Sequence, residues 1–409
     1  MLVDIEPSKI EGKIKAPQSK SYGIRLILYS ILKESKLDNL VYSEDVKVAI
    51  DVVKALGISV YGSLFKKEKE LKVPPYLYFG GSATTLRMTI PIISVIGGEV
   101  LIDGDESLRK RPLNAIINAL RGQVNFSSNS LPMKMSGKLK ENYVKIDGSE
   151  SSQYISGFIY AFSLTGGGEI EIIPPISSKS YIYLTANLIN SLGGDVKIRD
   201  NKIYVNKGDF RPYVGKVPGD YALASFYAAS SIVTGGNLII EDVYEIPDFD
   251  GDHNIVKFYE EMGAESYVKE GKWFVKSSSK LKGIEVSIDD YPDLAPSIAS
   301  IAPFADSKTV IRDVRRLKIK ESNRIVTISD TLSRFNVKVS YDDEQIVIFP
   351  SSEIKRATIS CPNDHRIAMM ASVLSFKVGG VINNAECVNK SNPNFWKDLI
   401  SLGAKIIIK

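Results

Sequence analysis

Several short segments of this chain place cations, hydroxyl groups and carboxylates where a helix is expected to begin. In the segment APQSKSYGIR, Ser21 opens an apolar helix, Lys20 precedes it, and Arg25 lies one turn further along the same face. A helix N-terminus carries free backbone N–H groups and the positive end of the helix dipole, so this combination suits a phosphate. Taken alone, the segment also fits a capped helix with solvated Lys and Arg side chains.

The segment RLKIKESNRI offers acid–base chemistry beside two cations. Lys320, Glu321 and Arg324 lie at the expected start of another helix, and Glu321 and Arg324 are one turn apart. In the functional interpretation, Lys320 and Arg324 bind an anion, and Glu321 is an acid or base whose protonation they adjust. In the structural interpretation, Glu321 caps the helix and pairs with Arg324.

Two further segments bring ionisable groups to expected helix starts. CPNDHR places Asp364, His365 and Arg366 before an apolar helix, and His365 is one of only two histidines. A structural Asp–His pair at the helix cap is the alternative. YPDLAP places Asp293 between a proline and an apolar run, where an N-capping aspartate is common.

Weaker polar signals recur at other expected helix starts. They are Arg111 ahead of a proline, Lys390 near a proline, the run Ser151, Ser152 and Gln153, and the pair Ser178 and Tyr181. Each of these signals alone decides nothing. Their recurrence along the chain predicts that anionic ligands bind at several helix starts.

Twelve apolar, helix-like segments position these residues, and they form two families of six. Members of the first family are apolar on most faces, which predicts burial, and they recur about every 70 residues, as in a repeat protein. They open at Ser21, Ser82, Ser151, Asp220, Asp293 and Asn363. Members of the second family have one polar face, and most are followed by Gly or Asn, a helix C-cap signal. They end at Leu56-Gly57, Leu120-Arg121, Leu192-Gly193, Met262-Gly263, Phe335-Asn336 and Leu402-Gly403.

Strand-like runs fill the gaps between these helices, so the predicted fold class is α/β with six similar units. A chain of 409 residues is too long for one ordinary core, and two domains of about 200 residues are expected. Three units in each domain place the boundary near residues 217–219. The strand-like N-terminal segment fits either domain.

Composition excludes several classes of function. A formal net charge of +4 permits anionic ligands without requiring nucleic acid. The two cysteines, Cys361 and Cys387, and two histidines cannot supply a zinc site, and so few cysteines fit a reducing cytosol. The N-terminus lacks the apolar core of a signal peptide, and the longest apolar stretch, 88–96, is too short to span a bilayer. We therefore expect a cytoplasmic protein without a metal, a cofactor, a nucleic acid partner or a membrane partner.

The chain resembles the EPSP synthases (3-phosphoshikimate 1-carboxyvinyltransferases), the enolpyruvyl transferases of the shikimate pathway. The resemblance runs over residues 10–395 and rests on segments in the family's order. They are QSKSYGIR, GGSATTLR, RKRP, DGSESSQY, SSKSY, YPDLAP, IKESNR, NDHR and the segment around Lys390. It implies two domains of three βαβαββ units each, residues 15–217 and residues 1–14 plus 218–409, with the active site in the cleft between them. The implied reaction transfers the enolpyruvyl group of phosphoenolpyruvate to the 5-hydroxyl of shikimate 3-phosphate, with release of phosphate.

The resemblance also implies roles for individual residues. The ligands of shikimate 3-phosphate are Lys20, Ser21, Arg25, Ser151, Ser152, Gln153, Ser178, Tyr181, Asp293 and Lys320. The ligands of phosphoenolpyruvate are Lys20, Arg87, Arg111, Gln153, Arg324, Arg366 and Lys390. Asp293 is the expected base for the 5-hydroxyl and Glu321 the expected acid for the methylene carbon, while Lys20 and His365 assist through charge and hydrogen bonding.

The segment GGSATTLR departs from the family pattern. It has Gly81 where the family usually carries Asn and Ala83 where it usually carries Gly. The methyl group of Ala83 is expected to project towards phosphoenolpyruvate. The resemblance therefore implies weakened inhibition by glyphosate, which occupies that site in the family.

Three other functions compete with this one. The sister enzyme that transfers enolpyruvate to UDP-N-acetylglucosamine usually carries a cysteine in its first domain, whereas both cysteines here lie beyond residue 360. An RNA 3′-phosphate cyclase builds on similar units, but it needs a nucleotide-linked histidine near the C-terminus and a basic path for RNA. A non-catalytic repeat protein that binds anions has no use for Asp293 and Glu321 among so many cations. A monomer is expected, because two domains already shield the cleft.

Overall fold

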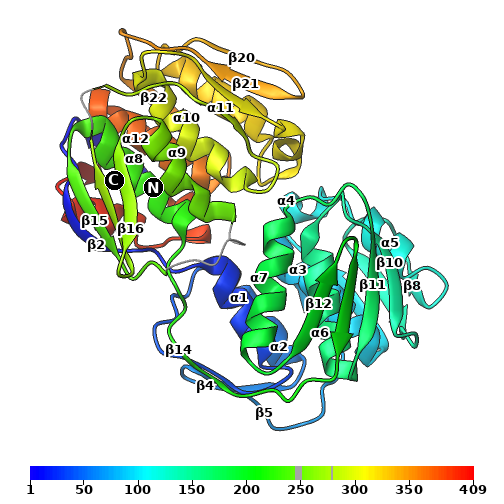
Figure 1. The fold of residues 1–409 in the computed structure, drawn as a ribbon. Coiled ribbons are helices and arrows are strands. Elements are labelled where there is room, and N and C mark those ends of the chain that lie inside the picture. Colours follow the sequence, from blue (N-terminus) through cyan, green and yellow to red (C-terminus); the bar gives the residue numbers. More distant parts are fainter. Residues whose placement is uncertain (245–250, 278–279) are drawn as a thin grey trace. The chain divides into compact units, whose positions relative to one another are not determined.

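The computed structural model describes residues 1–244, 251–277 and 280–409, which divide into two compact units (Figure 1). One unit, the discontinuous unit, consists of Met1–Ser19 and Pro218–Lys409, and the other, the continuous unit, is Lys20–Val217. The bounds expected from the sequence put residues 15–19 in the continuous unit. Lys15 instead pairs with Glu241, and the Ser19 N–H donates to Pro218 O at 2.8 Å, so these residues go with the discontinuous unit.

The described residues form six four-stranded sheets that share one strand order. In each sheet the first two strands are parallel, and the next two pairings are antiparallel. The sheet β10 (Tyr143–Asp147), β11 (Gly168–Ile173), β13 (Lys202–Asn206) and β12 (Asp195–Arg199) shows the pattern within one continuous stretch of chain. The helices α6 (Ser152–Thr165) and α7 (Lys179–Ser191) connect its strands, which makes the stretch a βαβαββ unit.

Three of the six sheets are completed by a strand from elsewhere in the chain. Besides the β10 sheet, the continuous unit contains two sheets. One has the order β14 (Tyr213–Gly215), β3 (Ser35–Leu37), β5 (Leu64–Lys67), β4 (Ile58–Tyr61). The other has the order β6 (Tyr76–Tyr78), β7 (Gly98–Asp103), β9 (Met133–Gly137), β8 (Val124–Phe126). The discontinuous unit contains β2 (Gly12–Lys15), β15 (Asn237–Glu241), β17 (Lys272–Lys276), β16 (Glu265–Lys269); β18 (Glu285–Ser287), β19 (Thr309–Arg312), β21 (Gln345–Ile348), β20 (Val339–Tyr341); and β22 (Ala357–Ser360), β23 (Gly380–Asn383), β1 (Leu2–Glu6), β24 (Lys405–Ile408). The strands that join from a distance are β14, β2 and β1.

The first helix of each βαβαββ repeat is buried, as its apolar sequence predicts. In the helix α8 (Tyr221–Thr234), every residue except Thr234 is buried. The helices α8, α10 (Ala295–Ile301) and α12 (His365–Val378) pack against one another in the core of the discontinuous unit. The helices α1 (Lys20–Tyr29), α3 (Ala83–Ile96) and α6 lie in the core of the continuous unit. Helices α3 and α6 approach closely at Gly157, where an added Cβ would lie 2.6 Å from a backbone oxygen of α3.

The second helices and short 3₁₀ turns complete the structure. They are α2 (Glu44–Ala55), α4 (Glu106–Arg109), α5 (Asn114–Ala119), α7, α9 (Ile255–Glu261), α11 (Arg324–Arg334), α13 (Phe395–Ser401), η1 (Gly251–Asn254), η2 (Pro292–Leu294), η3 (Ala302–Phe304), η4 (Val314–Ile319) and η5 (Ala385–Lys390). The expected C-caps are confirmed by left-handed backbone conformations, as at Gly193 (φ 93°) and Asn336 (φ 65°). At Leu120-Arg121 the left-handed residue comes one position later, at Gly122. Within the described ranges, no helix is long and apolar enough to cross a membrane.

Candidate active site

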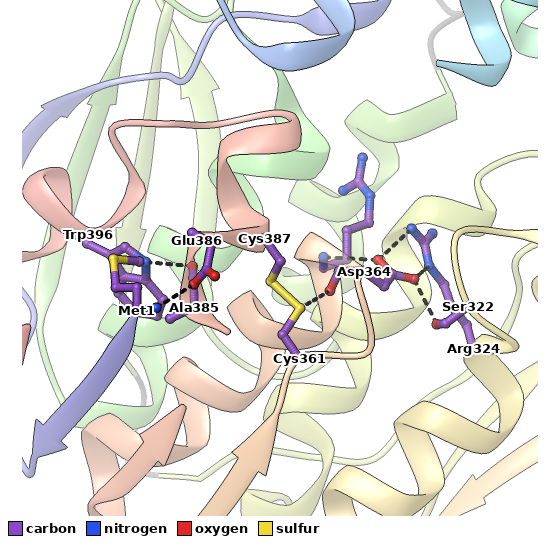
Figure 2. The surroundings of a disulfide bond; sticks show 10 residues. Met1, Ser322, Arg324, Cys361, Asp364, Ala385, Glu386, Cys387 and Trp396 are labelled. Atoms are coloured by element: carbon purple, nitrogen blue, oxygen red, sulfur yellow. Dashed lines mark hydrogen bonds and ion pairs between the residues drawn. A yellow bond between two sulfur atoms is a disulfide. The ribbon is translucent and has the colours of Figure 1, made fainter. Parts of the chain in front are cut away.

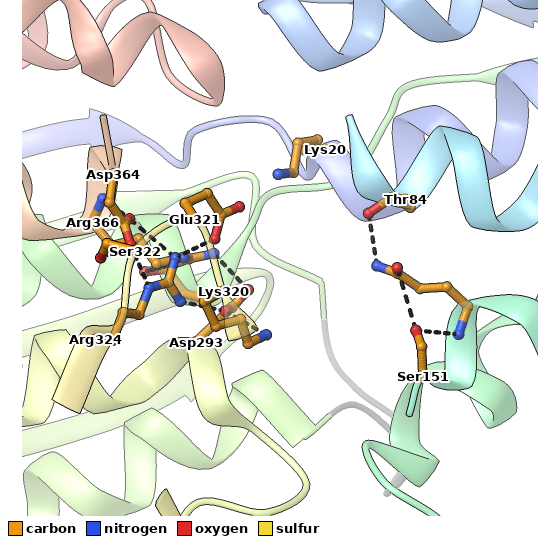
Figure 3. Close-up of polar contacts among 12 residues, drawn as sticks. Lys20, Thr84, Ser151, Asp293, Lys320, Glu321, Ser322, Arg324, Asp364 and Arg366 are labelled. Carbon is orange, nitrogen blue, oxygen red and sulfur yellow. Dashed lines mark hydrogen bonds and ion pairs between the residues drawn. The ribbon is translucent and has the colours of Figure 1, made fainter. Parts of the chain in front are cut away.

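Three helix starts of the discontinuous unit bring their polar side chains together around one carboxylate (Figure 3). The 3₁₀ turn η2, which leads into α10, carries Asp293, and the segment before α11 carries Lys320 and Glu321. The first residue of α11 is Arg324, and the second residue of α12 is Arg366. We call these five residues, together with Asp364 and Ser322, the Asp293 cluster.

The Asp293 carboxylate is ion-paired with three cations. Its Oδ1 accepts from Lys320 Nζ at 3.1 Å and from Arg324 Nη1 at 2.7 Å, and its Oδ2 accepts from Arg366 Nη2 at 3.2 Å. Burial alone would raise the pKa of Asp293, but these three positive charges hold that pKa well below its ordinary value of 3.8. In this structure Asp293 is therefore an ionised carboxylate, neutralised by cations that a bound anion could also use.

Asp293 does not cap a helix, which corrects the expectation that it is an N-cap. It lies inside η2, and α10 begins two residues later at Ala295. Pro292 fixes the backbone at the first position of η2, so Asp293 sits in a tight turn ahead of α10. Its side chain is thus available to the cations of the neighbouring helix starts.

The pKa of Lys320 is lower than that of an ordinary lysine. Burial lowers its pKa from 10.5 to about 8, although the nearby Asp293 carboxylate opposes this change. Arg316 and Arg324 add positive charge close by and lower the pKa further. A cation with a pKa near 8 can hold an anion at neutral pH and lose its charge in mildly alkaline solution.

Arg324 connects the three carboxylates of the cluster. Its Nε and Nη2 donate to Asp364 at 2.8 and 3.1 Å, and Nη2 also donates to Glu321 Oε2 at 2.9 Å. Burial alone would lower the pKa of Arg324, but its three carboxylate neighbours raise it above its ordinary value. The expected i, i+3 pair of Glu321 and Arg324 is present.

His365 and Lys390 are buried in the same unit. His365 is the first residue of α12, directly after the Asp364 carboxylate that accepts the Arg366 backbone N–H at 3.1 Å. Lys390 is the last residue of η5 and is 6% exposed. Arg366 also donates from Nη1 to Ala222 O at 3.3 Å, while its buried Nε has no hydrogen-bond partner among the residues that the structure describes.

In the continuous unit, Gln153 joins the starts of α3 and α6 through its contacts with Thr84 and Ser151, which Figure 3 labels. Its Nε2 donates to Thr84 Oγ1 at 2.8 Å, and its Oε1 lies 3.5 Å from Arg87 Nη1. Ser151 is the N-cap of α6, and its hydroxyl accepts from the Gln153 backbone N–H at 3.2 Å. We call Thr84, Arg87, Ser151 and Gln153 the Gln153 cluster.

Arg87 is the buried cation of this cluster. The side chain is 6% exposed, and its guanidinium carbon lies 5.6 Å from the centre of the Tyr154 ring. Its Nε and Nη2 are buried and have no hydrogen-bond partner in the described part of the chain. Buried guanidinium donors without a partner are costly, so they indicate a site for an anion.

Arg25 and its neighbours form a separate group in the continuous unit. Arg25 is buried, donates from Nε to Thr185 Oγ1 at 2.8 Å and from Nη1 to Ser21 O at 3.0 Å, and lies over the ring of Tyr181. Ser178 precedes α7 with a left-handed φ of 49°, which is uncommon for a residue other than glycine. The expected positions of Ser21 and Arg25 on one face of α1 are thus observed.

The remaining expected residues of the continuous unit are also buried or nearly so. Lys20 forms an ion pair of 2.8 Å with Asp45, a residue of α2. Ser152 is the first residue of α6 and is 2% exposed. Arg111 lies between α4 and α5 and is 8% exposed.

Four residues that hold expected site residues in place were not predicted from the sequence. Asp364 holds Arg324 and accepts from the Ser322 hydroxyl, Thr84 holds Gln153, and Asp45 pairs with Lys20. Asp364 was visible as a helix-cap aspartate, but its partner lies 40 positions away. Asp45 lies directly after a Ser-Glu helix start, so nothing in its local sequence marks it as the partner of Lys20.

The Asp293 cluster can bind anions and move protons, and the Gln153 cluster can bind an anion. The Asp293 cluster combines two carboxylates beside Lys320 with two buried guanidinium groups. The Gln153 cluster contains a guanidinium, that of Arg87, with two buried donors that have no partner among the described residues. The described residues contain no group of three or more His, Cys, Asp or Glu side chains arranged to hold a metal ion.

The fold is that of the enolpyruvyl transferases. The structure resembles EPSP synthase from Acinetobacter baumannii with a TM-score of 0.80 and 24% identity, covering 100% of both chains. It also resembles the enolpyruvyl transferase NikO from Streptomyces tendae with a TM-score of 0.77 and 14% identity, covering 99% of this chain and 98% of that one. At such low identity these likenesses establish the fold alone.

Sequence comparison identifies the family. The family model for EPSP synthase (3-phosphoshikimate 1-carboxyvinyltransferase) matches residues 5–399. The 3-phosphoshikimate 1-carboxyvinyltransferase of Sulfurisphaera tokodaii is 74% identical over 409 residues, which cover 100% of both chains. The chain belongs to the EPSP synthase family, and the resemblance inferred from its motifs is confirmed.

Proposed function

We propose that this chain transfers the enolpyruvyl group of phosphoenolpyruvate to the 5-hydroxyl of shikimate 3-phosphate and releases phosphate. The observation that carries the proposal is the Asp293 cluster, in which an ionised carboxylate is held by three cations next to a second carboxylate, Glu321. A reaction between two polyanionic substrates needs both the cations and a pair of proton-transfer groups.

Asp293 is the proposed base. Its pKa is low only because Lys320, Arg324 and Arg366 surround it. When the phosphate and carboxylate groups of the substrates bind these cations, the ligands neutralise part of the positive charge that stabilises the ionised form of Asp293. The pKa of Asp293 then rises towards its ordinary value, so substrate binding itself makes Asp293 a better base.

Glu321 is the proposed acid. The 5-hydroxyl oxygen attacks C2 of phosphoenolpyruvate as its proton passes to Asp293, and the methylene carbon gains a proton from Glu321. Loss of phosphate and of one methyl proton from the resulting intermediate restores the double bond. Arg324, which contacts both Asp293 and Glu321, fixes the positions of the two groups relative to each other. Lys20 and His365 assist these steps through charge and hydrogen bonding.

The anions are bound by the remaining residues. In the part of the chain that the structure describes, Arg87 has two donor nitrogens without a partner and Arg366 has one, so both are suited to the carboxylate and phosphate of phosphoenolpyruvate. The proposed set for phosphoenolpyruvate is Lys20, Arg87, Arg111, Gln153, Arg324, Arg366 and Lys390. The proposed set for shikimate 3-phosphate is Lys20, Ser21, Arg25, Ser151, Ser152, Gln153, Ser178, Tyr181, Asp293 and Lys320. The proposal also takes the protein to act as a cytoplasmic monomer.

The test is release of inorganic phosphate when the purified protein is mixed with phosphoenolpyruvate and shikimate 3-phosphate. Activity should require both substrates, and UDP-N-acetylglucosamine should not replace shikimate 3-phosphate. A folded protein that releases no phosphate from the pair, or that prefers the nucleotide sugar, contradicts the proposal.

A further inference from the structure

A disulfide bond between Cys361 and Cys387 joins two loops of the discontinuous unit (Figure 2). The loops follow the neighbouring parallel strands β22 and β23, whose last residues, Ser360 and Asn383, are paired in register. In parallel sheets the loops at the carboxyl ends of the strands carry binding residues. The disulfide therefore lies at the edge of the sheet where ligand-binding loops are expected.

Each cysteine lies three residues ahead of a proposed functional segment. Cys361 precedes Asp364, which accepts the Arg366 backbone N–H and holds the Arg324 guanidinium. Cys387 precedes Lys390, the last residue of η5. The covalent bond thus connects the segment that positions two arginines of the proposed phosphoenolpyruvate site with the segment that carries its lysine.

Two polar contacts of η5 tie it to the β1 side, although η5 also packs against α12. The Ala385 N–H donates to Met1 O at 3.1 Å, and Glu386 pairs with the N-terminal ammonium group at 3.0 Å, both on the β1 side (Figure 2). Beyond Lys390, Asn392 donates to Tyr227 Oη of α8 at 2.7 Å. Within the described contacts, the disulfide is the covalent link between η5 and the loop that opens α12.

The loop on the other side is short and has an uncommon backbone. Two residues separate Cys361 from the capping Asp364, and one of them, Asn363, has a left-handed φ of 60°. Such a conformation persists only when its surroundings hold it in place. The Cys361 N–H donates to Asn383 O at 3.0 Å, and the disulfide adds a second attachment at the same residue.

We propose that this disulfide positions the phosphoenolpyruvate-binding cations, so that the affinity for phosphoenolpyruvate depends on the redox state of the cysteine pair. The inference rests on the proposed function. A dithiol reductant donates two electrons and two protons, the S–S bond breaks to give two thiols, and the reductant becomes a disulfide. Cys361 is 6% exposed while Cys387 is only partly buried, so exchange begins at the Cys387 sulfur.

The effect is specific to one substrate. The proposed residues for shikimate 3-phosphate include only Asp293 and Lys320 from this unit, and neither lies on a loop that the disulfide joins. After reduction, the segments that carry Arg366 and Lys390 can shift by about 1 Å. This shift weakens the binding of phosphoenolpyruvate and changes the binding of shikimate 3-phosphate little. We expect reduction to raise KM for phosphoenolpyruvate about tenfold, and to change KM for shikimate 3-phosphate by less than about twofold.

The experiment compares the oxidised chain, the same chain reduced with dithiothreitol, and the double variant Cys361→Ser/Cys387→Ser with and without dithiothreitol. Thiol titration of the denatured chain should find no free thiol before reduction and two afterwards. The double variant should have the KM values of the reduced chain, and dithiothreitol should leave them unchanged. Because the reduced wild-type chain keeps both side chains, it tests the proposal even where the double variant folds poorly.

Three results overturn the inference. They are two free thiols in the chain after oxidation, a KM for phosphoenolpyruvate that is unaffected by reduction, and an equal rise of both KM values, which would indicate general loosening. Absence of any activity in the oxidised chain contradicts the proposed function instead, so the two failures are distinguishable.

Discussion

Arg324 and Asp364 form a bidentate ion pair in the core of the discontinuous unit. Arg324 Nε lies 2.8 Å from Asp364 Oδ2 and Nη2 lies 3.1 Å from Oδ1, and the two side chains are 1% and 0% exposed. Asp364 also caps α12, while Arg324 opens α11. The pair therefore fixes the starts of two helices relative to each other and aims the rest of the Arg324 guanidinium at Asp293 and Glu321.

Removal of the Asp364 charge should destabilise the protein strongly. Asp364→Asn leaves a buried guanidinium without its main counter-charge, and breaking such a pair costs about 3 kcal/mol or more. The free energy of unfolding, measured by denaturant titration, should fall by this amount. The matched control is Glu285→Gln, which breaks the solvent-exposed pair with Arg312 and should leave the unfolding curve unchanged. Equal unfolding curves for both variants would show that the buried pair contributes no more to the free energy of unfolding than the exposed pair does.

Asp293→Asn should abolish most of the turnover while the fold and substrate binding survive. The amide cannot accept the hydroxyl proton, and loss of a positioned base lowers the rate by about 10²- to 10⁴-fold. The three cations that pair with Asp293 become more available to substrate anions. We therefore expect kcat to fall by this factor and KM for either substrate to stay level or decrease. A variant with full turnover would exclude Asp293 as the base.

The pH profile should contain an alkaline limb that belongs to Lys320. The pKa of this lysine is about 8, so it is charged below that pH and neutral above it. Because kcat/KM reports groups of the free enzyme, its value for shikimate 3-phosphate should fall as the pH rises through 8. Lys320→Arg keeps its charge and should lack this limb. The same limb in Lys320→Arg would assign it to another group.

Lys320 should also leave a signature in stability. Its pKa is about 8 in the folded chain and 10.5 as the ordinary value, so the unfolded chain binds the proton more tightly between these two values. The contribution of Lys320 to the free energy of unfolding therefore rises from pH 8 towards pH 10.5, and the unfavourable burial of its charge is fully present below pH 8. The difference between the unfolding free energies of wild type and Lys320→Met over this range measures it, and a flat difference would contradict the lowered pKa.

Arg87→Gln should weaken binding of phosphoenolpyruvate. Two buried nitrogens of Arg87 have no partner among the described residues, and hydrogen bonds to charged groups contribute about 1.5–3 kcal/mol each. Loss of one such bond corresponds to a rise in KM of roughly 10- to 100-fold. The control is Arg109→Gln, because Arg109 is exposed and pairs with Asp103 on the surface. Equal effects of the two substitutions would argue against an anion site at Arg87.

Ala83→Gly should strengthen inhibition by glyphosate. Ala83 is the first residue of α3, is 7% exposed, and precedes Thr84, the partner of Gln153. If the methyl group narrows the phosphoenolpyruvate site as the family pattern implies, its removal should lower the inhibition constant of glyphosate. Measurement of inhibition against phosphoenolpyruvate decides this, and an unchanged constant would show that Ala83 does not limit access.

Local sequence signals were sufficient for the class of fold but not for its assembly. Apolar periodicity and Gly or Asn caps correctly predicted helices such as α8 and α11, because these signals act within a few residues. The pairing of β14 with β3 or of β2 with β15 joins strands far apart in the chain, and no local pattern encodes it. The strand-like N-terminus was recognisable, but its place between β23 and β24 was not.

The same distinction holds for the candidate site. Helix-start motifs pointed to Asp293, Glu321 and Arg324, which the structure brings together. The role of Asp364 depends on a contact across 40 positions, and the expectation of a reducing compartment gave no reason to pair Cys361 with Cys387. The catalytic and binding roles of the site residues remain predictions for the experiments above.

The two ends of the chain meet in one sheet. Leu2 and Lys409 exchange backbone hydrogen bonds of 2.8 Å in both directions, and β1 lies between β23 and β24. During synthesis, the continuous unit with its own apolar core is complete once Val217 has left the ribosome, whereas β1 must wait for the last residues of the chain. A nascent chain therefore carries one finished unit and an unpaired first strand for half of its translation, and truncation of even the last strand should leave the N-terminal strand exposed to aggregation.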